Sequence, residues 1–258
     1  MTKLWMILTS LLLALLSSIA TAQHYDVVPY ANAGKLYTGA HDDGGILPDA
    51  FNVRVFGYDL DESDPGIPFV DPAPYGSNDP GFNNGSGFTN GVFPNNGLLP
   101  NGVLRYGITS NLLFWDGTGG AAFSPVDAPV SLDISGDGGT TSVFGSGLPA
   151  TTGADPGLVA AVPSGRVHDH LVSSLQHSGG QALLEDGIYL VGMHLLHSTG
   201  IESDPFYMVY NLRLDESLHD EAIEWVEANL VPEPTSLSLA GISLLGMAAF
   251  ARRRRRLR

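Results

Sequence analysis

The chain has 258 residues, a net charge of −15 and no cysteine, and only 15% of its residues are charged. The lack of cysteine excludes disulfides, thiolate metal sites and cysteine nucleophiles. Between Gln23 and Val231, 26 acidic residues accompany only five basic ones. Such an acidic body repels phosphates, which excludes nucleic acid as a partner.

Residues 1–22 have the layout of a secretory signal peptide. Lys3 precedes an apolar run from Leu4 to Ile19, and Ala20-Thr21-Ala22 is a small-x-small cleavage signal. This layout predicts cleavage after Ala22 and an exported body that begins at Gln23. The alternative is that the segment stays as a membrane anchor.

The body, residues 23–231, contains several runs in which apolar and polar residues alternate with the period of a half-buried strand. Three such runs are FNVRVFGYDL at 51–60, VSLDI at 130–134 and FYMVYNLRL at 206–214. Asp-Gly and Ser-Gly turn signals separate the runs. We therefore expect an all-β body, an antiparallel β-sandwich or jelly roll.

The stretch from Asp71 to Gly102 is rich in glycine, proline and asparagine and is long for a loop within a compact domain. It contains Phe82, Phe88 and Phe93. We expect these phenylalanines to pin the loop onto the body. The alternative is an exposed platform on which sugars stack.

The histidines form the one group of residues in the sequence that is typical of a metal site. His168 and His170 flank Asp169 and would share one face of a strand, and His194 could meet them from a neighbouring strand. Three imidazoles would give a cupin-like site for zinc, iron or manganese. The glutamate of the cupin pattern is missing, and histidines in sheets more often make structural hydrogen bonds. We therefore expect structural histidines, with no cofactor and no catalytic residue, and the metal site is the alternative.

Carboxylates cluster in DLDESDPG at 59–66. The cluster lacks the glycine and the distal glutamate of a calcium loop. We expect a solvated turn here, with calcium binding as the alternative.

The segment SLHDEAIEWVEANL at 217–230 predicts one amphipathic helix. Ser217 is the expected cap, with Asp220 three residues later. The apolar face is made by Ala222, Ile223, Trp225, Val226 and Leu230. We expect this helix to pack on the sheet and close the body, whereas a partner-binding helix is the alternative.

Residues 232–258 have the layout of a separate sorting signal. Pro232, Glu233 and Pro234 precede the uncharged segment 235–251, which is long enough, at about 25 Å, to form a short transmembrane helix. The arginines that follow it are Arg252, Arg253, Arg254, Arg255 and Arg256. The positive-inside rule places them in the cytoplasm and the body outside.

This order of VPEP, apolar helix and arginine cluster resembles the PEP-CTERM sorting signal of exported bacterial proteins. The resemblance implies that an exosortase, a membrane-embedded transpeptidase-like enzyme, processes the chain near Pro232-Glu233-Pro234. It also implies transient anchoring in the membrane and a final place at the cell surface or in the extracellular medium. Bacteria with this system make exopolysaccharide, which is therefore an expected partner.

The body is similar to uncharacterised PEP-CTERM proteins in DPGF at 79–82, FWDGTG at 114–119, HDHL at 168–171, DGIYLVGMHL at 186–195 and SDPFYMVYN at 203–211. That likeness implies no activity, because none is established for that group. We expect a non-enzymatic surface or matrix protein. The alternatives are a carbohydrate-binding jelly-roll module and a cupin-like metal-dependent enzyme.

Overall fold

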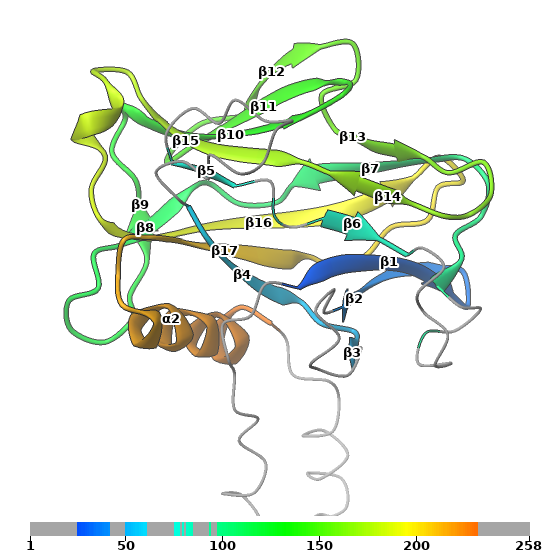
Figure 1. Cartoon of the computed structure of the whole chain (residues 1–258), viewed down its shortest axis with the longest axis horizontal. Coiled ribbons are helices and arrows are strands. Elements are labelled where there is room, and N and C mark those ends of the chain that lie inside the picture. The colour runs from blue at the N-terminus through cyan, green and yellow to red at the C-terminus, as the bar shows by residue number, and fades with distance from the viewer. Residues whose placement is uncertain are drawn as a thin grey trace, which may run out of the picture.

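The computed structural model describes residues 25–41, 50–60, 75–77, 79, 81–84, 93 and 97–231. The predicted signal peptide and the predicted transmembrane helix lie outside these residues. The described part is mostly β with one helix at its C-terminal end, as the sequence predicted, and its sheets are curled (Figure 1). Among the described residues, no helix is long and apolar enough to cross a membrane.

The described strands form three sheets. The first has the order β14 (His168–His170), β6 (Gly81–Asn83), β1 (Asp26–Asn32), β2 (Lys35–His41) and β3 (Ala50–Phe51). The second has the order β12 (Ala150–Gly153), β11 (Gly139–Phe144), β10 (Val130–Gly136), β15 (Val172–His177) and β5 (Gly76–Ser77). The third has the order β13 (Leu158–Ala161), β7 (Val103–Ile108), β16 (Gly187–His197), β17 (Phe206–Leu212) and β4 (Val55–Asp59), and β8 (Leu113–Trp115) and β9 (Ser124–Pro125) join it beside β16.

Most of these strand pairs are antiparallel, as the sequence predicted, but β1 pairs with β6 and β17 pairs with β4 in parallel. Each parallel pair joins segments far apart in the chain. Such pairing leaves no mark in a local alternating pattern. One consequence is that the ends of β4 and β17 meet at the same edge of the third sheet.

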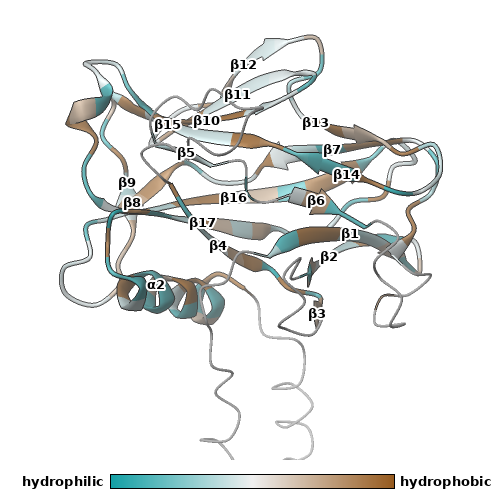
Figure 2. Ribbon diagram, viewed as in Figure 1, coloured by the Kyte–Doolittle hydropathy of each residue, from teal (hydrophilic) through white to brown (hydrophobic). Residues whose placement is uncertain are grey.

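Strand β16 lies at the centre of the layers and is buried on both faces (Figures 1 and 2). On one face, Tyr189, Val191 and Met193 join a large core shared with β10 and β15 of the second sheet. On the other face, Ile188 and Leu190 pack in a smaller core beneath the helix. The order of layers is therefore second sheet, third sheet and helix.

The helix α2 (Glu216–Asn229) confirms the predicted helix at 217–230 and its predicted packing on the sheet. Its buried side chains are His219, Ala222, Ile223 and Val226. The expected cap, Ser217, was wrong, because the N-cap lies two residues earlier. Asp215 is the N-cap, with no side-chain capping hydrogen bond.

The alternating run at 51–60 does not form one strand. Asn52 has a left-handed backbone (φ 60°) and separates β3 from β4. Phe51, which the pattern placed with Val55 on an inner face, is instead 62% exposed. A left-handed residue turns the chain, so the period-two pattern does not continue across it.

Two phenylalanines of the glycine-rich stretch are buried and pin it to the body, as expected. Phe82 is 0% exposed on β6, and Phe93 is 2% exposed and packs against Tyr30 of β1 at 5.3 Å between ring centroids. Phe88 lies outside the described residues. The described rings therefore serve packing and do not form an open sugar platform.

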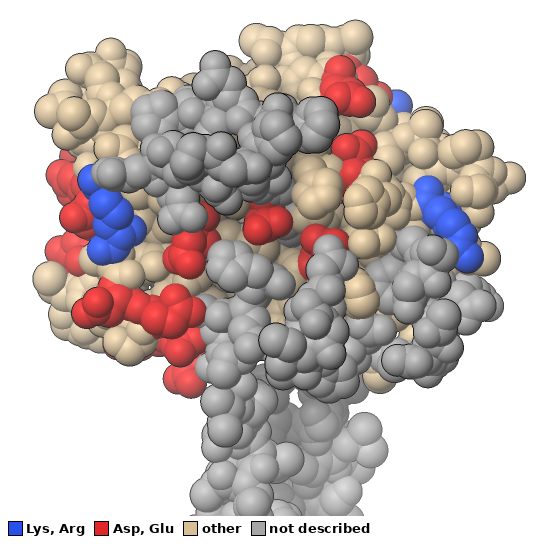
Figure 3. Space-filling view, in the orientation of Figure 1, with Lys and Arg blue, Asp and Glu red and all other residues tan. Residues whose placement is uncertain are grey.

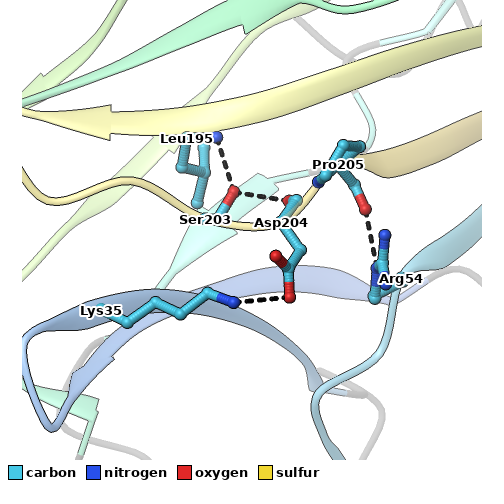
Figure 4. A network of polar contacts seen from close by, with 6 residues as sticks. All are labelled: Lys35, Arg54, Leu195, Ser203, Asp204 and Pro205. Carbon is cyan, nitrogen blue, oxygen red and sulfur yellow. Dashed lines mark hydrogen bonds and ion pairs between the residues drawn. The ribbon is translucent and has the colours of Figure 1, made fainter. Parts of the chain in front are cut away.

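The first sheet is tied to the loop between β16 and β17 by polar contacts (Figure 4). Lys35 Nζ donates to Asp204 Oδ2 at 2.7 Å, and Arg54 Nε donates to the carbonyl of Pro205 at 2.7 Å. Ser203 Oγ accepts the N–H of Leu195 at 2.8 Å, which holds the loop against β16. The Lys35 contact ties β2 of the first sheet to this loop, and the Arg54 contact ties the segment between β3 and β4 to it.

Candidate functional site

The two histidines of HDHL lie together on β14. Their rings meet edge to face, with centroids 5.5 Å apart, and both side chains are exposed. Asp169 between them is half-buried. Burial raises the pKa of the Asp169 carboxyl, and the N–H of His170, 2.9 Å from Oδ1, offsets part of this rise.

Strand β6 supports this pair. His170 stands opposite Gly81 in the β14–β6 ladder, and His168 stands opposite Asn83. A Cβ atom at residue 81 would lie 2.8 Å from His170 Cε1 and closer still to Asp26 Oδ1. Glycine is needed here because the imidazole and the buried Asp26 both approach the strand backbone.

The structure does not bring His194 to His168 and His170. His194 lies on β16 in the third sheet, with its ring over Gly107 of β7, while β14 is the edge of the first sheet. The three ring nitrogens form no group of ligand atoms within 4.8 Å of one another. Period two predicts which residues share a face but not which strands become neighbours, so the sequence could not place His194 relative to the other two histidines.

Among the described residues, one such group does exist, made by Asp59, Glu216 and His219. It joins the end of β4 to the first turn of α2. From the sequence, Asp59 was expected in an acidic turn, and His219 was not singled out as a site residue. The available signal was a histidine three residues after a glutamate, within the apolar stripe of the predicted helix.

A pocket of about 250 Å³ opens between β8, β9 and the 3₁₀ helix η2 (Gln181–Leu183). Its walls include Phe114 and Tyr189, whose ring centroids are 4.9 Å apart, together with Asp127, His177 and Glu185. Trp115, next to Phe114, is only 3% exposed and donates its Nε1–H to the carbonyl of Thr118 at 3.1 Å. The tryptophan therefore belongs to the core and not to the pocket.

The predicted sorting residues Pro232 to Pro234 and Arg252 to Arg256 lie outside the described residues. The described chain reaches Val231, and both Leu230 and Val231 pack against the core beneath α2. Tyr207 Oη also donates to the carbonyl of Leu230 at 3.3 Å. The body is thus packed up to the residue that precedes Pro232.

Residues 230–256 match the family model of the PEP-CTERM protein-sorting motif. The chain therefore carries a sorting motif that implies export and processing by exosortase. No curated protein and no solved structure matches the chain.

Proposed function

We propose that residues 23–231 form a non-enzymatic structural or binding protein of the cell surface or extracellular matrix. The sorting motif supports delivery to that place. The acidic surface supports it too, because carboxylates are spread over the described part of the face in Figure 3 and basic side chains are few. A surface of one sign keeps an exported protein soluble and separate from its neighbours.

One observation carries this proposal, namely that the described core extends to Val231, the residue before Pro232. α2 packs on β4 and β17, and Leu230 and Val231 close the core beneath it. The matched motif starts at residue 230. Cleavage near Pro232-Glu233-Pro234 would therefore remove the rest of the sorting signal and leave every described core residue in place.

The proposed topology follows from the two ends of the chain. Residues 1–22 would direct export and be removed after Ala22, and residues 235–251 would span the inner membrane. Arg252 to Arg256 would stay in the cytoplasm until processing. The body would then be released to the surface or the extracellular polymer.

Fractionation of cells tests the proposal. Deleting residues 232–258 should move the body from the membrane and surface fractions to the soluble exported fraction. Replacing Arg252 to Arg256 by serine should leave unprocessed chain, because the orientation of the anchor is weakened. The matched control is Arg166→Ser, an exposed arginine of the body. Unchanged surface display after the deletion would contradict the proposal.

A second candidate function, binding of a sugar unit as in a carbohydrate-binding jelly-roll module, is favoured by the pocket beside η2. It combines aromatic walls from Phe114 and Tyr189 with the exposed carboxylates of Asp127 and Glu185. Apolar walls with a few polar groups are typical of small-molecule sites. Exopolysaccharide from an exosortase-containing bacterium should bind the wild-type chain, and Asp127→Asn with Glu185→Gln should weaken it. Asp137→Asn, outside the pocket, is the control, and equal binding by all three proteins would exclude this site.

A further inference from the structure

Asp59, Glu216 and His219 come together where the end of β4 meets the first turn of α2. Asp59 is the last residue of β4 and lies opposite Asn211 of the parallel strand β17. Glu216 is the first residue of α2, and His219 lies three residues later. Residues three apart on a helix share a face, so both side chains turn toward the strand ends.

The hydrogen bond that His219 makes assigns the proton on its ring. Nε2 lies 3.0 Å from the carbonyl oxygen of Val209. A carbonyl only accepts, so Nε2 carries the proton and donates it. In the neutral imidazole, Nδ1 then presents a lone pair.

This lone pair is buried without a partner. His219 is 2% exposed, and its Nδ1 makes no hydrogen bond. The ring lies close to the strand backbone at Gly57, where an added Cβ would be 3.0 Å from Nε2. A buried nitrogen without a partner is unfavourable unless something binds it.

Negative charge faces the same nitrogen. Asp59 Oδ1 lies 3.9 Å from Nδ1, and the carboxylate of Glu216 completes a group within 4.8 Å. A lone pair and two carboxylates repel one another. A cation between them would reverse all three interactions, and a divalent ion would neutralise both carboxylates.

We propose that Nδ1 of His219 and the carboxylates of Asp59 and Glu216 bind one divalent cation of the zinc class. Imidazole with two carboxylates suits Zn²⁺ and does not suit the all-oxygen sites of calcium. Tetrahedral ligands at ~2.0–2.2 Å from zinc lie about 3.4 Å from one another. The 3.9 Å between Asp59 Oδ1 and His219 Nδ1 would have to shorten by about 0.5 Å on binding, and the exposed Glu216 side chain would have to rotate toward the same point.

The surrounding hydrogen bonds support ligand roles. The Nε2–H···O=C bond to Val209 is the contact by which proteins orient a metal-binding imidazole. Asn211 Nδ2 donates to Asp59 Oδ1 at 2.9 Å, and Asn211 Oδ1 accepts the N–H of Leu214 at 3.0 Å. Asn211 therefore holds the Asp59 carboxylate against the turn that leads into α2.

The ion would clip α2 to the end of β4. Because the body has no cysteine, it has no disulfide to join segments as distant in sequence as residues 59 and 216. Metal binding that requires the folded arrangement stabilises that arrangement. This role is separate from sorting and does not depend on the proposed function.

Titration of the purified, chelator-treated full chain with Zn²⁺ tests the site. We expect one Zn²⁺ per chain and a change in the ¹⁵N shift of His219 Nδ1 while Nε2 stays protonated. Asp59→Asn and Glu216→Gln should each weaken binding by about tenfold or more. Both variants should fold, because Glu216 is exposed and asparagine at 59 keeps an oxygen for Asn211.

The matched control is Glu224→Gln, an exposed glutamate on the same helix, which should bind Zn²⁺ as the wild type does. The double variant His168→Ala with His170→Ala should retain the site. The proposal is overturned if the wild type binds no Zn²⁺. That result is expected if Nδ1 carries a proton and His219 pairs with Asp59 instead of a metal ion. The proposal is also overturned if binding survives Asp59→Asn and Glu216→Gln but is lost with the β14 histidines.

Discussion

Asn84 shows how much of the glycine-rich stretch depends on a single side chain. The residue is 0% exposed, and its Nδ2 lies within 3.2 Å of the carbonyl oxygens of Pro29, Gly97 and Gly165. Its Oδ1 accepts the N–H of Val167 at 2.6 Å. One amide thus joins β1 to two segments that are distant in the chain.

Replacing Asn84 by alanine should lower the free energy of unfolding by about 3 kcal/mol, because several backbone groups lose their partner while buried. Urea unfolding of the two proteins measures this difference. Asn111→Ala, at an exposed asparagine, should change stability by less than about 0.5 kcal/mol. Equal losses in the two variants would contradict the assigned role of Asn84.

His197 makes the stability depend on pH. The residue is 4% exposed, and burial lowers the pKa of its imidazole. Its Nδ1 accepts the N–H of Thr199 at 3.2 Å, so a proton on Nδ1 would break this bond. Below the ordinary histidine pKa the unfolded chain therefore binds more protons than the folded chain, and stability falls as the pH falls.

Wild type should accordingly lose more stability between pH 7 and pH 5 than the variant His197→Asn. Asparagine keeps an acceptor for Thr199 and does not titrate. Urea unfolding at the two pH values gives the slopes. If the slopes are the same, His197 does not contribute to the pH dependence.

The packing of α2 on the third sheet requires a glycine in β4. A Cβ on Gly57 would lie 2.5 Å from Ile223 Cδ1 and 3.0 Å from His219 Nε2. Gly57→Ala should therefore push the helix outward and destabilise the body by about 1–3 kcal/mol. Thermal unfolding checks this. Gly120→Ala, where the nearest atom is 4.0 Å away, is the control and should leave the melting temperature nearly unchanged.

Among the secondary-structure elements, the sequence predicted those that depend on the local pattern of apolar and polar residues. The run 130–134 became β10, with Leu132 and Ile134 buried, and the run from Phe206 became β17. The helix was predicted to within about one residue at each end. These predictions are correct because the apolar periodicity of each element matches a face that a neighbouring element covers.

What pattern could not predict is which strands become neighbours. The metal-site alternative required His168 and His194 to lie on neighbouring strands, but β14 and β16 belong to different sheets. His219 and Asp59 do meet, because the parallel pairing of β17 with β4 brings the end of β4 to the start of α2. Both outcomes depend on long-range pairing, which leaves no local signal in the sequence.

At the scale of the whole molecule, two functions are separated along the chain. Residues up to Val231 make layers with continuous cores, and the matched sorting motif occupies residues 230–256. The body would keep its fold once the sorting signal has been removed.

The intact mass of the protein recovered from the surface or the medium of exporting cells tests this central claim most directly. We expect a chain that begins at Gln23, contains the whole body through Val231, and lacks Arg252 to Arg258. The same cells without exosortase should retain the arginine tail. A surface form that still ends at Arg258, or one cut inside the described core, would contradict the account.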